Sequence, residues 1–341
     1  MKIFVLIPCY NEELSIKKSL EGWLLQTRPI DKIIVVDDKS TDKTVKIIKS
    51  FGRKVKLIEL PKKRGNKSYV QQAGLKYINS DIFITTDGDT IPHKGFALEV
   101  ENAFKDPKVT AFAGHVKSFK KNWLTACREM EYSFGQLLHK TAQNELNFVH
   151  VIPGCASAFR TDYFKKYIHF DHDTLTEDLD FTYKLNLNFQ KIHYSPKAIV
   201  YTQDPATLEA YIKQMRRWYI GAWQNLIKHK KILKRPIPAL ETLLMYVVDA
   251  PFYFFMLYIL PFINIKFYSL FILAYLGGII TLGIFTAILN KRWDLFLYSP
   301  TYLLVSYINC YIFVEQFFKE IVFRKKQLDW QHPERWQINN L

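Results

Sequence analysis

The chain has few cysteines, and they are not spaced like those of a metal site or a disulfide framework. Its 341 residues include four of them. None belongs to a Cys-x-x-Cys pair, and none has a histidine at the spacing that zinc sites use. These absences argue against a disulfide-stapled scaffold and a zinc domain, and they indicate reduced thiols in a cytosolic domain. The four are Cys9, Cys127, Cys155 and Cys310.

The sequence also lacks internal repeats, low-complexity segments and a recognisable secretion signal. The apolar run at residues 3–7 is too short for a signal peptide, and no small-residue cleavage site follows it. We therefore expect this run to be a buried first strand. We also expect the soluble part of the chain to begin on the cytosolic side of a membrane.

Charged residues are almost missing from one long stretch, residues 243–318. The whole chain has a formal net charge of +15, which suits nucleic acid, anionic lipid or a phosphate-bearing ligand. The basic residues form no platform with interleaved aromatics. Those at 228–235 and 324–326 flank the uncharged stretch, whereas those at 62–64 lie far from it. This pattern favours a lipid bilayer as partner and no nucleic acid.

The uncharged stretch contains three segments long enough to cross a bilayer core of about 30 Å. The basic residues at 228–235 are expected to stay in the cytosol. A third crossing would place those at 324–326 outside, against that rule, and Pro300 and Glu315 lie in the last segment. The sequence predicts a multi-pass protein of the plasma or inner membrane and leaves two or three crossings open. The three segments are residues 243–263, 267–289 and 295–318.

Short apolar runs alternate with segments of helical periodicity in the first two-thirds of the chain. This alternation predicts an α/β fold with a mostly parallel sheet covered by helices on both faces. The predicted strands are residues 3–7, 33–36, 55–60 and 82–86, with a strand or loop at 151–160. The predicted helices are residues 12–27, 45–51, 68–78, 123–145, 176–187 and 207–230.

Polar clusters follow three of the predicted strands, at residues 8–11, 37–38 and 87–89. In open α/β sheets, ligands bind at the carboxyl ends of the strands. Because these three clusters would occupy such ends, we expect them to form one site at one edge of the sheet.

The Asp87-Gly88-Asp89 turn is the candidate metal site. Its two carboxylates, with a glycine between them, can reach a divalent ion and a ribose together. Mg²⁺ or Mn²⁺ takes few protein ligands and fills its shell with phosphate oxygens. The alternative is an ordinary surface turn, because Asp-Gly is common in turns.

Three residues are candidates for binding a nucleotide. Asp38 could accept a hydrogen bond from a uracil ring nitrogen, Tyr10 could pack on the base, and Lys67 could meet a phosphate. The plainer interpretations are a helix N-cap for Asp38, a partly buried turn residue for Tyr10 and a solvated side chain for Lys67.

Asp178 is the candidate general base, since a carboxylate beside an acceptor hydroxyl can remove its proton during attack on an anomeric carbon. Attack from the face opposite the leaving phosphate inverts that carbon, so an α-linked donor should give a β-linkage. The alternative is a helix N-terminus enriched in acids, which the helix dipole favours.

The Gln214-x-x-Arg217-Trp218 motif lies on the predicted helix 207–230. Arg217 would meet the diphosphate leaving group, and Trp218 would stack against the acceptor sugar. The alternative is an interfacial helix whose tryptophans and arginines sit at headgroup level. We prefer this alternative for Arg216 and Trp223.

Together these motifs resemble those of the membrane-embedded family 2 glycosyltransferases, which include the cellulose, chitin, hyaluronan and poly-N-acetylglucosamine synthases and the Nod-factor chitooligosaccharide synthase. The resemblance covers residues 1–240 by motif and 241–341 by architecture. The matching segments are Pro8-Cys9-Tyr10-Asn11-Glu12, Val36-Asp37-Asp38, Asp87-Gly88-Asp89, Gly154-Cys155, Thr176-Glu177-Asp178 and Gln214 to Trp218.

The resemblance implies a GT-A fold, a nucleotide-sugar donor, a divalent metal (Mg²⁺ or Mn²⁺) and inversion. It adds further residues to the site. Pro8, Asn11 and Glu12 join the donor nucleotide site, and Asp87 serves both donor and metal. Gly154, Cys155 and Glu177 would lie beside the acceptor, and Gln214 supports the Arg-Trp motif.

The chain departs from this family in two respects. Thr90 stands where some synthases place a metal-contacting histidine, and the helices that often precede the catalytic domain are missing. We predict a cytosolic GT-A domain at residues 1–235, a membrane domain at 236–322 and a basic tail at 323–341. The tail segment Trp330-x-x-Pro333-x-Arg335-Trp336 is similar to one that covers the donor site in related synthases.

The sequence therefore predicts a membrane glycosyltransferase that extends a β-linked glycan, with N-acetylglucosamine from UDP as the best-guess donor. The main alternative is a single transfer to a lipid such as ceramide or polyprenyl phosphate, because ceramide glucosyltransferases carry a similar motif set. A non-catalytic membrane scaffold is the more remote alternative. The sequence leaves the acceptor, glycan or lipid-linked, and the oligomeric state open.

Overall fold

The computed structural model describes residues 1–324, 328 and 335–337. Contacts divide the chain into two compact units. The predicted linear division at residues 235 and 322 remains a prediction. The first unit comprises Met1–Lys117, Gln136–Gln203 and Leu328–Leu341, and the second comprises Ser118–Gly135 and Asp204–Gln327.

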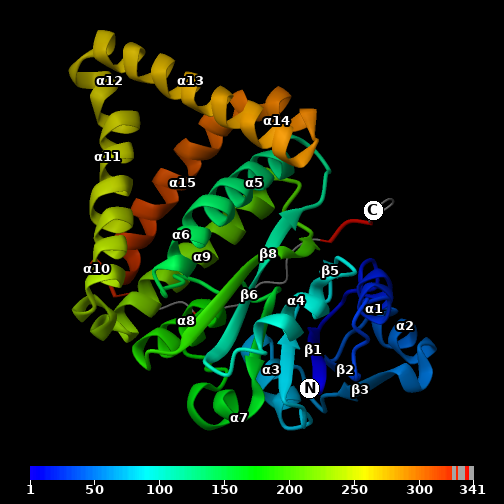
Figure 1. The fold of residues 1–341 in the computed structure, drawn as a ribbon. Helices are drawn as coiled ribbons and strands as arrows, with labels where there is room; N and C mark the ends of the chain where they lie inside the picture. Colours follow the sequence, from blue (N-terminus) through cyan, green and yellow to red (C-terminus); the bar gives the residue numbers. More distant parts are fainter. Residues whose placement is uncertain (325–327, 329–334, 338–341) are drawn as a thin grey trace. The chain divides into compact units, whose positions relative to one another are not determined.

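The first unit is built on one eight-stranded sheet (Figure 1). In chain order its strands are β1 (Ile3–Cys9), β2 (Lys32–Asp37), β3 (Val55–Glu59), β4 (Ile82–Thr85), β5 (Ile91–Pro92), β6 (Val109–Ser118), β7 (Ser157–Arg160) and β8 (Lys191–Thr202). Across the sheet the order is β3-β2-β1-β4-β7-β6-β8-β5. Every residue of β1 and β4 is buried, as expected for strands covered on both faces.

The sheet is mixed. Strands β3, β2, β1 and β4 pair in parallel, because helices between them provide the crossovers that parallel pairing needs. Strand β7 runs antiparallel to both β4 and β6, and β5 runs antiparallel to β8. The predicted parallel arrangement is therefore confirmed for the N-terminal strands, and antiparallel pairs extend the sheet beyond them.

Helices of the first unit cover the sheet and share its hydrophobic core. Val70 of α3 and Phe181 of α8 lie in one buried cluster with Phe4, Val36 and Phe83 of the strands. The two helices are therefore anchored by the same apolar core. The helices of this unit are α1 (Ile16–Leu24), α2 (Thr44–Ser50), α3 (Lys67–Leu75), α4 (Phe96–Ala103), α6 (Thr141–Glu145), α7 (Thr161–Tyr163) and α8 (Glu177–Leu187), with η1 (Gly52–Lys54), η2 (Gly135–Lys140) and η3 (Phe164–Ile168).

Gly74 lets α3 lie close against β1 and β2. A Cβ at this position would lie 2.4 Å from Leu6 Cδ1 and 2.7 Å from Val36 Cγ2. We expect Gly74→Ala to lower the free energy of unfolding by about 1–3 kcal/mol through overpacking, although alanine is the better helix former. Urea unfolding of the purified chain measures this change.

Gly135 provides the control for this substitution. It also has helical dihedral angles, and a Cβ there would meet nothing within 4 Å. Gly135→Ala is expected to leave stability unchanged or raise it slightly. If the two substitutions change the free energy of unfolding equally, close packing around Gly74 does not explain the effect of Gly74→Ala.

The second unit is helical. Its helices are α5 (Trp123–Phe134), α9 (Leu208–Lys228), α10 (Pro236–Leu243), α11 (Ala250–Phe254), α12 (Leu260–Ile263), α13 (Ile265–Asn290), α14 (Trp293–Tyr298) and α15 (Tyr302–Phe317). Shorter helical turns join them: η4 (Lys230–Lys234), η5 (Leu244–Asp249), η6 (Phe255–Ile259), η7 (Ser299–Thr301) and η8 (Phe318–Val322). The predicted helix 123–145 is present as α5, η2 and α6 in succession.

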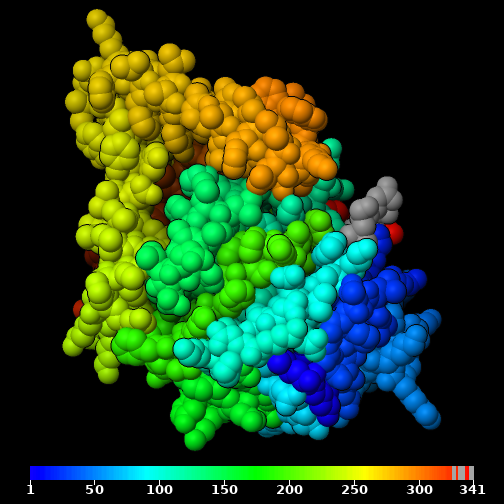
Figure 2. Space-filling model, in the orientation of Figure 1, coloured from blue at the N-terminus to red at the C-terminus, as the bar shows by residue number. Residues whose placement is uncertain are grey.

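Within the described residues, two continuous helical stretches are long and apolar enough to cross a membrane. They are Pro236–Ile263 and Ile265–Asn290, with mean hydropathies of 1.8 and 2.2. Large apolar side chains such as Phe262, Leu270 and Leu273 are exposed on them, and Figure 2 shows these helices, in yellow, at the surface. The third predicted segment falls in α14 and α15 and is not among these stretches. The number of crossings remains a prediction.

Candidate functional site

The parallel strands bring three polar segments to one edge of the sheet. Cys9, the last residue of β1, is in register with Asp37, the last residue of β2. Leu6 is in register with Thr85, the last residue of β4. The Asp38 N–H also donates to the Cys9 carbonyl at 2.8 Å. The residues that follow these strands therefore leave the sheet at the same side, as a ligand site at strand ends requires.

Lys67 joins the Asp-Gly-Asp turn to the start of α8. Its Nζ lies 2.6 Å from Asp87 Oδ1 and 2.8 Å from Glu177 Oε1. Burial lowers the pKa of this ammonium, but the two carboxylates outweigh burial and hold the pKa above its ordinary value. The side chain is thus an ion-paired bridge rather than the solvated lysine that the sequence left as the alternative.

Gly154 lies against this bridge. A Cβ on it would lie 3.1 Å from Lys67 Nζ, 3.2 Å from Glu177 Oε1 and 3.5 Å from the Asp178 Cβ. The next residue, Cys155, accepts a hydrogen bond at its carbonyl from Thr86 Oγ1 at 2.8 Å. Residues that the sequence assigned separately to acceptor, donor and base therefore lie together in the first unit.

Asp178 lies in the first turn of α8 and is partly exposed. Its Oδ1 accepts a hydrogen bond from the Leu179 N–H at 2.9 Å. Thr176 occupies the N-cap position of α8, but its side chain makes no capping hydrogen bond. The carboxylate therefore stands at the positive end of a helix, which favours its charged form.

Lys140 is a buried cation near Asp178 that the sequence analysis did not identify. Burial lowers the pKa of this lysine to about 8, while the charge of Asp178 raises it. Its Nζ also lies 5.8 Å from the centre of the Tyr194 ring. A lysine within a long amphipathic helical pattern is ordinarily solvated, so nothing in the pattern distinguished this one.

The thiols of this unit are unreactive in character. Burial, followed by the charges of Glu12 and Asp37, raises the pKa of Cys9. Burial and then the charge of Asp87 raise the pKa of Cys155. Both thiols therefore stay protonated near neutral pH, and the chain's cysteines are free, as the spacing predicted.

Asp89 and Glu12 bind the same arginine. Arg335 Nη1 lies 2.7 Å from Asp89 Oδ2, and Arg335 Nε lies 2.9 and 2.8 Å from the two carboxylate oxygens of Glu12. Burial raises the pKa of Asp89 to about 7; Arg335 opposes that rise, whereas the charges of Glu12 and Asp87 add to it. Of the predicted tail motif, Arg335 and Trp336 are described, whereas Trp330 and Pro333 lie outside the described residues.

These carboxylates fit a divalent cation. Asp87, Asp89 and Glu12 offer the hard oxygen ligands that Mg²⁺ and Mn²⁺ prefer. The guanidinium of Arg335 between Asp89 and Glu12 shows that a positive charge is stabilised there. The site's carboxylates outnumber its cationic side chains, so the site as a whole favours positive charge.

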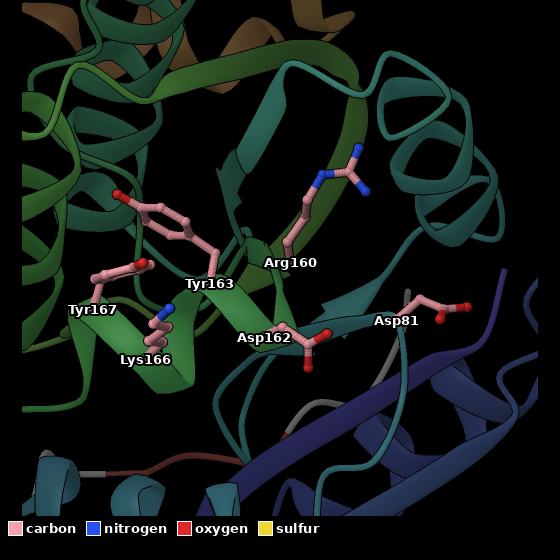
Figure 3. Close-up of a pocket in the computed structure, with 6 residues that line it drawn as sticks. All are labelled: Asp81, Arg160, Asp162, Tyr163, Lys166 and Tyr167. Atoms are coloured by element: carbon pink, nitrogen blue, oxygen red, sulfur yellow. The ribbon is translucent and has the colours of Figure 1, made fainter.

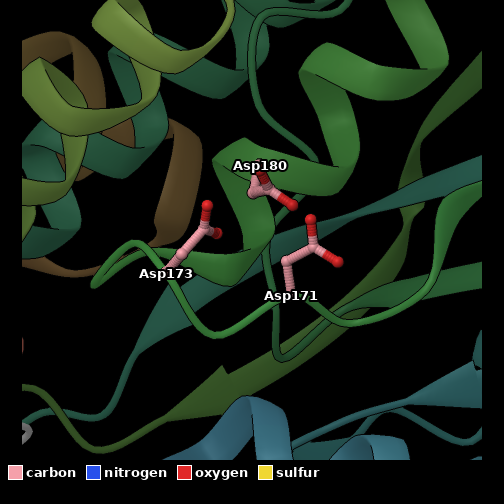
Figure 4. Close-up of side chains that lie close together, drawn as sticks. All are labelled: Asp171, Asp173 and Asp180. Carbon is pink, nitrogen blue, oxygen red and sulfur yellow. The ribbon is translucent and has the colours of Figure 1, made fainter.

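A second acidic cluster lies in the first unit, formed by Asp171, Asp173 and Asp180 (Figure 4). Their nearest oxygens lie within 4.8 Å of one another. However, Lys184 Nζ lies 2.7 Å from both Asp171 and Asp180. The cluster is thus already neutralised in part by a lysine one helical turn beyond Asp180, and it contains none of the predicted metal ligands.

The predicted base-binding residues contact neighbouring segments, chiefly the loop at 63–65. Asp38 accepts hydrogen bonds from the Arg64 and Gly65 N–H groups at 2.6 and 2.8 Å. Tyr10 lies under Lys63, with 4.0 Å from Nζ to the ring centre. Asn11 accepts a hydrogen bond from the Thr41 N–H at 2.8 Å, and Pro8 is part of β1. Asp38 therefore positions this loop whether or not it also binds a base.

The Gln-x-x-Arg-Trp motif lies on α9 in the second unit. Trp218 packs on a cluster containing Tyr211, and its ring centre is 4.8 Å from the guanidinium carbon of Arg128. Gln214 Oε1 is buried and accepts no hydrogen bond from a described residue. Arg217 is partly exposed. These three residues remain predicted site residues.

Arg216 and Trp223, for which we preferred a position at headgroup level, have partners within the second unit. Arg216 forms an ion pair with Glu315, with 3.0 Å between Nε and Oε2. Trp223 is buried and packs against Tyr246, Phe313 and Phe317. Both side chains therefore stabilise the helical unit.

A pocket of about 420 Å³ lies elsewhere on the first unit (Figure 3). Asp81 in its lining precedes β4, whereas the Asp-Gly-Asp turn follows β4, so the pocket is at the opposite end of that strand. Arg160 in the lining donates to the carbonyls of Phe104, Asp106 and Val109. None of the predicted site residues lines this pocket. The lining comprises Asp81, Arg160, Asp162, Tyr163, Lys166 and Tyr167.

His150 makes the first unit sensitive to acid. Burial, followed by the charge of Lys140, lowers the pKa of this histidine to about 4. The unfolded chain therefore binds one more proton than the folded chain between pH 4 and pH 6.5. The free energy of unfolding should fall by about 3 kcal/mol as the pH decreases through this range.

Comparing unfolding at pH 7 and pH 4.5 tests this expectation. His150→Asn should show a shallower pH dependence than the native chain. The exposed His172 provides the control, since His172→Asn should keep the native dependence. An unchanged slope in His150→Asn would show that other groups cause the acid sensitivity.

The family of the chain follows from comparison with known proteins. Residues 2–221 match the model described as "Glycosyltransferase like family 2". The chain belongs to this family. Among curated proteins, this glycosyltransferase is 27% identical over 230 residues to a poly-β-1,6-N-acetyl-D-glucosamine synthase of Staphylococcus epidermidis, covering 66% of this chain and 56% of the relative. It is 29% identical over 238 residues to the probable glycosyltransferase YdaM of Bacillus subtilis, covering 67% and 56%. The chain thus matches somewhat more than half the length of these relatives.

Solved structures confirm the fold of this family 2 glycosyltransferase. The mannosyltransferase PcManGT from Pyrobaculum calidifontis, in complex with GDP-Man and Mn²⁺, has a TM-score of 0.63 at 19% identity, covering 95% of this chain and 88% of its own. TarS from Staphylococcus aureus, residues 1–349 with UDP-GlcNAc, has a TM-score of 0.51 at 20% identity, covering 94% and 92%. The chain therefore has the GT-A-like fold that the sequence predicted.

Proposed function

We propose that the chain transfers a sugar from a nucleotide diphosphate donor to a growing β-linked glycan, with inversion at the anomeric carbon. N-acetylglucosamine from UDP is the proposed donor group. The observation that carries this proposal is the bridge from Asp87 through Lys67 to Glu177, which brings the candidate metal turn beside Asp178. The names of the synthase relatives and the UDP-GlcNAc held by TarS support the choice of sugar.

In the proposed mechanism, Asp178 accepts the proton of the acceptor hydroxyl as its oxygen attacks the anomeric carbon. The new carbon–oxygen bond forms while the bond to the diphosphate breaks, and the electron pair leaves with the nucleoside diphosphate. Lys67 and Arg217 would meet its phosphates. Asp89 and Asp87 would hold Mg²⁺ or Mn²⁺, which supplies positive charge for the leaving diphosphate. Mn²⁺ in the mannosyltransferase structure supports this assignment.

The remaining predicted residues have proposed roles around this reaction. Asp38 and Tyr10, with Pro8, Asn11 and Glu12, would form the donor nucleotide site. Gly154, Cys155, Glu177 and Trp218 would line the acceptor site, and Gln214 would support Trp218. The first unit contributes all of these except Trp218 and Gln214.

We also propose that the protein is multi-pass and that its catalytic part faces the cytosol. The two apolar helical stretches support membrane association. The basic residues at 228–235, directly before the first stretch, favour a cytosolic start. A cytosolic site would meet nucleotide sugars where cells make them, and it could use a glycan or lipid-linked acceptor at the bilayer.

Product sizing tests the proposed function. The purified full chain, in detergent with Mn²⁺ or Mg²⁺, is incubated with radiolabelled UDP-GlcNAc and, in parallel, UDP-glucose and GDP-mannose. A ladder of β-linked products from UDP-GlcNAc alone is expected. A product with one sugar on an extractable lipid would refute polymerisation and favour single transfer to a lipid acceptor. No transfer from any donor would refute the proposal, provided that the chain is folded.

A further inference from the structure

The ion pairs of Arg335 place a positive charge of the chain itself on the carboxylates that would hold a metal. The guanidinium contacts Asp89 through Nη1 at 2.7 Å and both oxygens of Glu12 through Nε at 2.8 and 2.9 Å. The Arg335 side chain is 11% exposed, and Asp89 and Glu12 are both buried. Charge-assisted contacts of arginine with buried carboxylates are strong and directional.

This contact conflicts with cation binding at Asp89. A divalent cation would need the same carboxylate oxygens, because it binds hard oxygen ligands at short distances. Two positive charges beside one buried carboxylate would also repel each other more strongly than in water. Arg335 and the cation therefore cannot both occupy Asp89 in this arrangement.

We propose that Arg335 is an autoinhibitory latch that competes with the divalent cation for Asp89. This inference rests on the proposed role of Asp89 in holding that cation. Without the cation, the latch neutralises Asp89 and Glu12 and covers the metal position. Binding of the cation neutralises Asp89 instead and releases the arginine.

The contacts of the described tail residues suit a reversible latch. Besides the ion pairs of Arg335, the Trp336 N–H donates to Gln203 Oε1 at 3.1 Å. This neutral hydrogen bond contributes less than a charged contact does. The charged contacts of Arg335 are ones that a divalent cation can displace.

Cation affinity provides the first test. Mn²⁺ binding to the purified full chain is titrated by electron paramagnetic resonance, without a nucleotide sugar. If the latch is closed in most molecules, the apparent affinity of the native chain is reduced by the small open fraction. Arg335→Gln should then bind Mn²⁺ about tenfold more tightly, which corresponds to a latch closed in about nine molecules of ten.

Arg324→Gln is the matched control for this titration. It removes the same charge from an exposed position at the start of the tail and should leave the affinity for Mn²⁺ unchanged. Equal or weaker Mn²⁺ binding by Arg335→Gln than by the native chain would overturn the latch. If Arg335→Gln and Arg324→Gln gain the same affinity for Mn²⁺, the gain is a general charge effect. That result would also overturn the latch.

Limited proteolysis of the native chain tests release directly, without a variant at Arg335. Trypsin cleavage after Arg335 frees the peptide 336–341, which mass spectrometry can follow. Saturating Mn²⁺ should accelerate this cleavage several-fold, and Glu12→Gln should accelerate it without Mn²⁺. A rate that Mn²⁺ does not change would contradict the latch.

These tests separate the latch from the proposed function. Mn²⁺ that binds equally to the native chain and to Arg335→Gln removes only the latch. Mn²⁺ that binds to neither protein removes both the latch and the proposed cation site. The sugar-transfer assay enters neither measurement, so its outcome cannot be mistaken for theirs.

Discussion

Asp178→Asn is expected to slow sugar transfer by about a hundred- to ten-thousand-fold, the range that a general base contributes. The amide has nearly the same shape as the carboxylate, but it cannot accept the acceptor's proton. The Oδ1 atom can still accept the Leu179 N–H, so the first turn of α8 should persist. Turnover with radiolabelled UDP-GlcNAc measures the loss.

Donor binding distinguishes loss of the base from loss of the site. UDP affinity, measured by calorimetry, should be the same in Asp178→Asn and in the native chain. Asp162→Asn is the control for a lost carboxylate, because Asp162 is exposed and lies outside the candidate site. If Asp178→Asn retains turnover, another group is the base; if it loses UDP binding as well, Asp178 has a structural role.

Removing divalent cations should have an effect of similar size. Treatment with EDTA is expected to reduce transfer by about a thousandfold, equivalent to about 4 kcal/mol of transition-state stabilisation. The physical reason is that the leaving diphosphate would carry its developing charge without a neutralising partner. Adding back Mn²⁺ or Mg²⁺ should restore the native rate.

Asp89→Asn should cause the same loss, and adding Mn²⁺ should not reverse it. The substitution removes one charge from a buried carboxylate whose proposed role is to hold the cation. Asp173→Asn is the control, since Asp173 is an exposed carboxylate of the second acidic cluster. Full activity in EDTA would refute the role proposed for Asp89. Loss of sugar transfer in Asp173→Asn would indicate that the second acidic cluster holds the cation.

The sequence was sufficient for the N-terminal part of the fold because local signals there agree. Strands β1, β2 and β4 are continuous apolar runs, and each is followed by a turn with polar residues. The parallel register then brings those turns to one edge. Beyond β4 the signals weaken. The antiparallel strand β7 is short, and its partners β4 and β6 are set by long-range pairing that no local pattern encodes.

The same distinction applies to the candidate site. Asp87, Glu177 and Gly154 could be found from motifs, because each motif is a short run of unusual residues. Lys140 and the second acidic cluster could not, since a lysine in an amphipathic helix and acids near a helix start are ordinary in sequence. Their importance depends on burial and on neighbours that only the folded chain provides.

The partner of Glu12 was equally hidden from the sequence. The family motif placed Glu12 at the donor nucleotide, and the tail resemblance pointed to a cover over that site. Neither observation predicted that Arg335 would contact Glu12 and Asp89. Arg335 is separated from both carboxylates by most of the chain. Only the tertiary structure makes competition with a cation a testable idea.

The protonated thiols of Cys9 and Cys155 have a practical consequence for watching this enzyme at work. Reagents such as maleimides attack the thiolate, so these two protonated sulfurs should give little background at neutral pH. A cysteine placed at the exposed position of Gln337 could therefore carry a fluorescent or spin label in the native chain. Such a label would report each departure of the tail in real time.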